Sequence, residues 1–256
     1  MSKAKKREPL VHITKRGMLP LWHNLAIRAI GLAAALVVCA IVLYALTGLN
    51  PLKIYGAMFK GAFGSARRVW TTIREIMMLL CIGVGLAPAF KMRFWNIGGE
   101  GQVLVGGVAA AACMIYLAPK MPLAPVLLIM FVLSALAGAI WGLIPAVFKA
   151  RWNTNETLFT LMMNYIALQI TSFCVSKWEN PYGSNTVGII NPATNAGWFP
   201  SIFGQQYMLN VIIVVLIAVA MYLYLKYSKQ GFEIAVVGES MNTARYAAIN
   251  VKRVII

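Results

Sequence analysis

The chain has 256 residues, of which 60% are hydrophobic and only 12% are charged, whereas soluble domains carry about 25% charged residues. This composition excludes an ordinary soluble domain and favours a membrane protein. The net charge of +16 does not indicate a nucleic-acid partner, because the basic residues are spread over short loops between apolar segments and do not follow one face.

Uncharged apolar stretches recur along the chain. A helix rises about 1.5 Å per residue, so about 20 residues cross a hydrocarbon core of about 30 Å. The stretches are residues 29–52, 76–90, 101–119, 121–148, 157–176 and 207–225. The stretch at residues 76–90 is long enough to cross the membrane if its helix begins near Thr71. The sequence therefore predicts an all-α fold, a polytopic transmembrane bundle with about six spans.

The lysines and arginines predict the orientation. The amino terminus, the turns near residues 91–93 and 149–151, and the chain after residue 225 are rich in them, and the positive-inside rule places such segments in the cytoplasm. We expect a basic cytoplasmic segment at 1–23, a transmembrane domain at 24–227, and a cytoplasmic segment with the start of a further span at 228–256.

Two connections are then expected on the outer side. Residues 178–206 carry only Glu179 as a charged residue, which suits this side. The first connection fits less well, because it contains Lys53, Lys60, Arg67 and Arg68. It also contains a possible amphipathic helix around residues 54–63, which would lie flat at the interface.

A glycine-rich stretch follows the second span and predicts a broken helix near residues 94–102. Non-helical backbone at membrane depth must be packed in protein or line a wet cavity, and a carboxylate there costs on the order of 3 kcal/mol unless it is partnered or hydrated. Asn96, Glu100 and Gln102 are therefore candidates for a substrate pathway. The alternative is structural: Glu100 accepts backbone N–H groups and holds the break together.

The fifth span offers Asn164 as another pathway candidate, although a hydrogen bond to a neighbouring helix is the commoner role for such a residue. The span follows Asn-Thr-Asn-Glu at residues 153–156. Asn153 is a plausible N-cap, with Glu156 three residues later. Glu156 is expected to be a helix-start residue stabilised by the helix dipole.

After the sixth span, residues 231–250 predict a short helix that begins near Ser240 or Asn242 and ends at Asn250. It could be a simple surface helix. A rigid cytoplasmic helix between spans is also what a transporter needs to receive force from a soluble motor.

The residues for common enzyme chemistry are missing. The chain has no aspartate, and its histidines, His12 and His23, both lie near the amino terminus. This excludes most hydrolytic triads, carboxylate pairs and histidine-based metal centres. The ATP-binding sequence G-x-x-x-x-G-K-[ST] is also absent. We expect no enzyme activity, cofactor or metal, and any ATP must be hydrolysed by a partner.

Three stretches resemble the inner-membrane permeases of binding-protein-dependent ABC importers of the branched-chain amino acid, ribose and nucleoside type. Residues 96–102 are similar to the N-I-G-x-E-G-Q pattern of the nucleoside and simple-sugar branch, and residues 155–167 to N-E-[VT]…L-N-Y-I-A. Residues 231–250 are similar to G-F-E-x-x-x-V-G-x-N-x-x-A-A-R-Y-A-G-I-N, with Ser240 in place of Asn and Ala248 in place of Gly.

The resemblance implies a permease subunit of an ATP-driven importer for nucleosides or related small sugars, in the bacterial inner membrane. Its partners would be an ABC ATPase, a second permease subunit, an extracytoplasmic substrate-binding lipoprotein and membrane lipid. Family members continue with further spans, so the chain reads as a truncated permease. The alternative is an ion-coupled secondary transporter, which needs a deep titratable cluster, and here only Glu100 is offered.

The resemblance also implies a coupling helix over residues 238–250 that docks in a groove of the ATPase. The coupling residues would be Gly238, Glu239, Ser240, Asn242, Ala244, Arg245, Tyr246 and Asn250.

Overall fold

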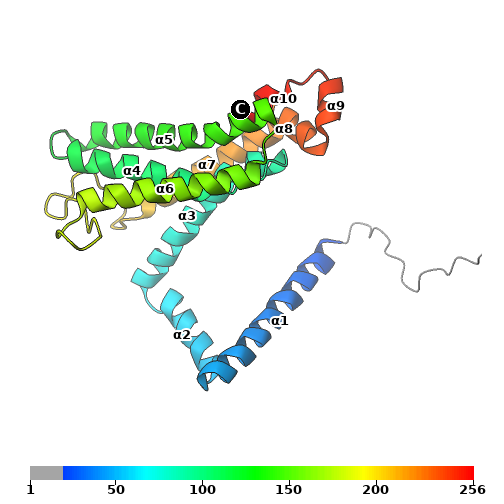
Figure 1. Ribbon diagram of the computed structural model, residues 1–256. Coiled ribbons are helices and arrows are strands. Elements are labelled where there is room, and N and C mark those ends of the chain that lie inside the picture. Colours follow the sequence, from blue (N-terminus) through cyan, green and yellow to red (C-terminus); the bar gives the residue numbers. More distant parts are fainter. Residues whose placement is uncertain (1–19) are drawn as a thin grey trace, which may run out of the picture. The chain divides into compact units, whose positions relative to one another are not determined.

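The computed structural model describes residues 20–256, which fold into helices joined by turns and loops (Figure 1). The helices are α1 (Leu21–Thr47), α2 (Pro51–Phe63), α3 (Ala66–Lys91), α4 (Gly99–Tyr116), α5 (Leu123–Trp152), α6 (Glu156–Trp178), α7 (Met208–Tyr227), α8 (Lys229–Glu239), α9 (Met241–Tyr246) and α10 (Val251–Ile255). The chain divides into two compact units, one up to Arg68 and one from Val69 to Ile256.

Six of the helices described are long and apolar enough to cross a membrane, namely α1, α3, α4, α5, α6 and α7. This confirms the predicted all-α, six-span class. Helices α1 and α3 begin earlier than expected, at Leu21 and Ala66, because charged and polar residues near an interface end an apolar run without ending a helix. Most of the predicted amino-terminal segment lies outside the described residues, and its last three residues belong to α1.

The first unit contains α1 and α2. Helix α1 is followed by Gly48, which takes a left-handed conformation with φ 67°, the usual role of glycine after a helix. Asn50 then caps α2 by accepting a hydrogen bond from the Leu52 amide at 2.9 Å. The Tyr55 hydroxyl donates to the Leu36 carbonyl at 2.7 Å. The predicted short helix in this connection is thereby confirmed.

In the second unit, α4 packs against both α5 and α6 (Figure 1). Small residues allow the close approach of α4 and α5. A side-chain carbon on Gly106 would lie 3.3 Å from the Ser134 carbonyl oxygen, and one on Gly138 would lie 3.4 Å from that of Gln102. This tight packing positions the residues at the start of α4.

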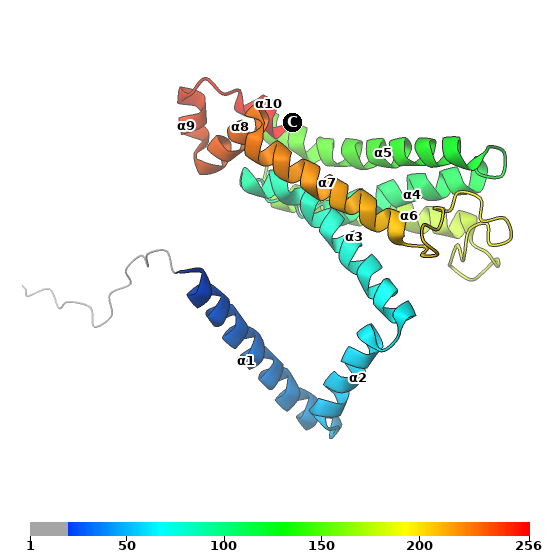
Figure 2. The same cartoon turned by 180° about the vertical axis from the view of Figure 1, so that it is seen from behind.

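Helices α8, α9 and α10 gather at the carboxyl end of α7 (Figure 2). They share one hydrophobic cluster with the segment that follows α3. The cluster, called here the coupling core, consists of Met92, Phe94, Ile234, Val237, Ala244 and Val251. The segment after the last span is therefore packed directly on the break between α3 and α4.

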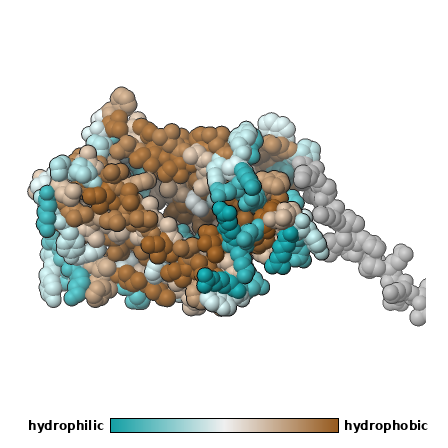
Figure 3. Space-filling view, turned by 90° about the horizontal axis from the view of Figure 1, so that it is seen from above, coloured by the Kyte–Doolittle hydropathy of each residue, from teal (hydrophilic) through white to brown (hydrophobic). Residues whose placement is uncertain are grey.

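Much of the surface is apolar. Hydrophobic residues cover large areas in Figure 3, and side chains in the middle of the spans are exposed, such as Leu128, Ile140 and Leu216. A soluble monomer rarely exposes such contiguous apolar surface. The spans therefore have the surface of helices that face lipid or other membrane helices.

Candidate functional site

The predicted helix break lies between Lys91, the last residue of α3, and Gly99, the first of α4. It begins slightly earlier than expected, and residues 99–102 are already helical. Several backbone groups of the break have hydrogen-bond partners. Two side chains of α6, Thr160 and Asn164, hydrogen-bond to it across the bundle.

Asn164 uses both ends of its amide on this segment. Its Oδ1 accepts from the Gly101 amide at 2.9 Å, and its Nδ2 donates to the Ile97 carbonyl at 3.0 Å. The residue is buried, and a side-chain carbon on Gly101 would come within 2.8 Å of its Oδ1. These contacts favour the structural role that was the alternative for Asn164.

Thr160 was missed from the sequence. Its side chain is fully buried, with 0% exposure. Its hydroxyl accepts from the Ile97 amide at 3.2 Å and donates to the Glu156 carbonyl at 2.8 Å. Helical spacing was the available signal, because Thr160 lies one turn before Asn164 on the same face of α6.

Asn96 and Gln102 line a cleft of about 440 Å³ together with residues of α5 and α10. Asn96 is buried and its Oδ1 accepts from the Gly98 amide at 2.8 Å. The half-buried Gln102 packs on Gly142, where a side-chain carbon would lie 2.8 Å from the Gln102 Nε2. The structure thus brings two of the four pathway candidates to one cleft.

Glu100 is exposed at the start of α4, away from the residues that line this cleft. Its carboxylate makes no hydrogen bond or ion pair within residues 20–256. The backbone-binding role considered for Glu100 is filled instead by Asn96, Thr160 and Asn164. A neutral amide or hydroxyl satisfies these backbone groups without burying a charge, which is the less costly arrangement.

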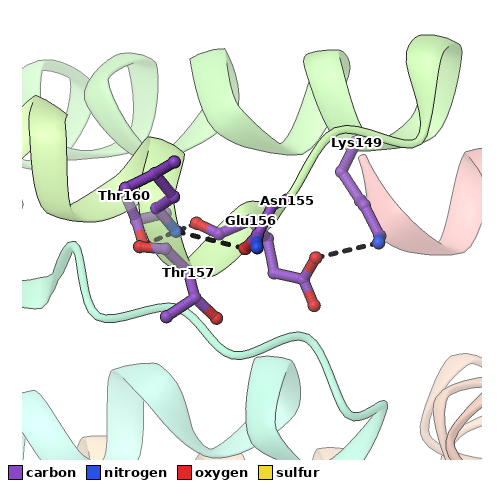
Figure 4. Close-up of polar contacts among 6 residues, drawn as sticks. Lys149, Asn155, Glu156, Thr157 and Thr160 are labelled. Atoms are coloured by element: carbon purple, nitrogen blue, oxygen red, sulfur yellow. Dashed lines mark hydrogen bonds and ion pairs between the residues drawn. The ribbon is translucent and has the colours of Figure 1, made fainter.

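The turn between α5 and α6 is held by an ion pair, shown in Figure 4. Lys149 Nζ lies 2.8 Å from Glu156 Oε2, and the two side chains are only 15% and 13% exposed. Glu156 is the first residue of α6, as expected. The prediction for Asn153 was wrong: it ends α5 in a left-handed conformation with φ 49°, and Asn155 caps α6 through the Leu158 amide at 3.2 Å.

The predicted coupling segment forms more than one helix. Gly238 and Glu239 are the last two residues of α8, and Ser240 caps α9 through the Thr243 amide at 3.3 Å. Asn242, Ala244, Arg245 and Tyr246 belong to α9. Asn250 caps α10 through the Arg253 amide at 3.2 Å.

The start of the predicted helix is confirmed, but its end at Asn250 was wrong. Helix α9 ends at Tyr246, and Ala248 takes a left-handed conformation with φ 57°. The Ile249 amide then bonds to the Ala244 carbonyl at 2.9 Å, a common way to close a helix. The resembling pattern has Gly in place of Ala248, which was a sequence signal for this stop.

Helix α9 is anchored on one side and exposed on the other. Ala244 is fully buried in the coupling core, whereas Tyr246 is 92% exposed and Arg245 is also exposed. Arg245 and Met241 line a groove of about 420 Å³ with Lys149 of α5. Helix α9 is therefore packed on the coupling core through Ala244, and its opposite face, with Arg245 and Tyr246, is polar and aromatic.

Gly238 is a point of close contact between α8 and the end of α3. A side-chain carbon on this residue would collide with the Lys91 carbonyl oxygen and lie 3.1 Å from the Met92 Cα. The Lys91 Nζ also donates to the Leu225 carbonyl at 3.0 Å. A hydrogen bond therefore joins the ends of α3 and α7, and the end of α8 packs directly against the end of α3.

Within the described part of the chain, no group of three histidine, cysteine, aspartate or glutamate side chains could hold a metal ion.

Comparison with known proteins assigns the family. The family described as "Branched-chain amino acid transport system / permease component" matches residues 68–256. The guanosine ABC transporter permease protein NupP of Bacillus subtilis is 32% identical over 88% of this chain and 63% of its own length. The nucleoside ABC transporter permease protein NupB of Lactococcus lactis is 27% identical over 82% and 59%.

The glucose ABC transporter permease protein TsgB13 of Haloferax volcanii is 25% identical over 94% of this chain and 65% of its own length. The chain thus spans less than two thirds of these curated relatives. No solved structure matches it. The family match covers most of the chain, including the helix break, α6 and the α8–α10 segment, and the chain therefore belongs to the branched-chain amino acid transport system permease family.

Proposed function

We propose that this chain is a membrane-embedded permease subunit of an ATP-driven importer, which carries nucleosides or related small sugars across the bacterial inner membrane. It performs no covalent chemistry. A separate ABC ATPase hydrolyses ATP, a second permease subunit completes the path, and an extracytoplasmic substrate-binding lipoprotein delivers the substrate. The amino terminus lies in the cytoplasm.

The packing of α9 is the observation that carries this proposal. Its exposed Arg245 and Tyr246 are available to a soluble partner, and its buried Ala244 contacts the same core as Met92 and Phe94. A displacement of α9 is therefore transmitted to the helix break, because packed cores shift as units and do not deform continuously. This is the mechanical requirement for coupling to an ATPase.

Two observations support the proposed substrate class: the names of the relatives and the cleft beside the helix break. Two of the relatives are named for guanosine or nucleosides and one for glucose. Asn96 and Gln102 line the cleft with amide groups, which can bind sugar hydroxyls without a charge. Asn164 acts indirectly, by positioning the break. Glu100 lies outside this cleft, and its exposed carboxylate is the one feature that keeps it a pathway candidate.

The ion-coupled alternative has less support. Such a transporter needs a buried group of titratable side chains near the bilayer midplane. Among residues 20–256, no three acidic, histidine or cysteine side chains gather in this way. Inactivating the ATPase is expected to stop uptake, whereas dissipating the ion gradients at constant ATP is not.

The decisive experiment is uptake of labelled guanosine, other nucleosides, pentoses and glucose by cells that express the complete transporter. The double variant Arg245→Ala with Tyr246→Ala is expected to lose at least about tenfold in uptake. The control is Tyr227→Ala, at an exposed tyrosine outside the coupling core. Unchanged uptake in the double variant, with the ATPase still co-purifying, would overturn the coupling role of α9.

A further inference from the structure

A two-residue hairpin interrupts the loop between α6 and α7. Ile202 and Gln205 exchange both backbone hydrogen bonds, at 3.2 and 3.0 Å. The two residues between them, Phe203 and Gly204, have φ values of 52° and 72°. Positive φ at both central positions defines a type I′ turn, for which Asn-Gly is the favoured sequence.

Phe203 is an unusual residue at this position. A bulky side chain in the left-handed region is a conformational outlier, and this one is also 87% exposed. The turn therefore holds an aromatic side chain outward at the cost of backbone strain. Strain retained at an exposed position points to a contact made by that side chain.

The position of the hairpin identifies the surroundings of its tip. Gln206 and Tyr207 form a turn that leads directly into α7, which begins at Met208. The Arg74 guanidinium lies over the Tyr207 ring, 5.3 Å from its centre. The tip thus lies at the end of a membrane span, at the level where lipid headgroups meet water.

The charge pattern distinguishes lipid from a protein partner. Residues 180–225 contain no charged side chain, so this loop offers nothing to an electrostatically guided protein partner. The outer connection with Lys53, Lys60, Arg67 and Arg68 offers such charges instead. An uncharged loop with a projecting aromatic ring suits the membrane interface.

We propose that the 202–205 hairpin is a membrane anchor, whose Phe203 side chain inserts among phospholipids at the amino-terminal end of α7. The anchor fixes the depth of α7 and of the long α6–α7 loop. It is a lipid contact of this chain alone and does not depend on the transported substrate.

Photo-crosslinking in living cells tests this directly. Benzoylphenylalanine replaces Phe203 in the complete transporter, in cells grown with radioactive phosphate to label phospholipids. Tyr182, exposed to 94% in the same α6–α7 loop, is the matched control position. We expect a labelled phospholipid adduct at position 203, several-fold above position 182. Equal labelling at the two positions, or a covalent protein partner as the main product at 203, would overturn the proposal.

Replacing Phe203 by other standard amino acids gives a second test, in which the rate of protease cleavage is measured. Phe203→Asn creates the favoured Asn-Gly turn and keeps the hairpin, but it removes the anchor. In sealed vesicles with the loop outside, we expect protease to cut the 180–206 loop at least about threefold faster in this variant, because the loop opens locally more often. In the Phe203→Trp variant, the loop should be cut at the same rate as in the parent protein. If Phe203→Asn also matched the parent, the anchor would be excluded.

Discussion

Gly238 of α8 lies so close to the carbonyl oxygen of Lys91 that no side-chain carbon fits between them. The contact joins the start of the coupling segment to the last turn of α3. Both neighbours are backbone, so a rotamer change cannot relieve an added group. The close approach is therefore a specific requirement for glycine.

Gly238→Ala is expected to destabilise the protein by about 1–3 kcal/mol, the usual cost of overpacking, and to reduce transport. Thermal unfolding of the purified transporter in detergent measures the first effect. Gly107→Ala is the matched control, since an added carbon there would meet nothing within 4 Å. A Gly238→Ala protein as stable as the parent would show that α8 can move away from α3 at little cost.

Thr160→Val tests the hydrogen bonds to the break. The change keeps the shape of the buried side chain but removes its hydroxyl, which leaves the Ile97 amide without its partner. The expected loss is about 1–3 kcal/mol, measured by thermal unfolding. Thr160→Ser keeps the hydroxyl and should lose less. If Val and Ser behave alike, packing and not hydrogen bonding explains the site.

Asn164→Ala should be more damaging than Thr160→Val, because it leaves both the Gly101 amide and the Ile97 carbonyl without partners. We expect a loss of about 2–4 kcal/mol. Gln169→Ala is the control, at an exposed amide further along the same helix. Equal stability of the two variants would contradict the positioning role of Asn164.

The ion pair of the α5–α6 turn is best tested by a double-mutant cycle. Lys149→Met or Glu156→Gln alone removes one partner of a largely buried pair. Each single change should destabilise by about 2–4 kcal/mol, and the double variant should recover part of this loss. Additive effects, with no recovery, would mean that the two side chains do not stabilise each other.

Ala248→Gly should stabilise the end of α9. The alanine holds a φ of 57°, and glycine adopts this conformation without a steric penalty. The expected gain is about 1 kcal/mol, seen as a higher unfolding temperature. Ala247→Gly is the control, because Ala247 has an ordinary φ of −78°. A gain in the control alone would contradict the argument.

The sequence was sufficient to predict the spans, the break and the start of α9, because these depend on apolar run length, glycine clustering and helix capping. The partners of individual side chains were harder to predict. Asn153 and Asn155 are both suitable helix caps, and only the turn that joins α5 to α6 decides between them. Thr160 is an ordinary residue in an apolar helix until the break is placed against it.

Thr160 and Asn164 both extend from α6 to the segment that leads into α4. Separating these two elements would strip hydrogen bonds from backbone groups that lipid cannot replace. We therefore expect α4 and α6 to move together as one rigid body. Bending between them and α3 would then be confined to the residues just after Lys91, where α3 ends and the coupling core begins.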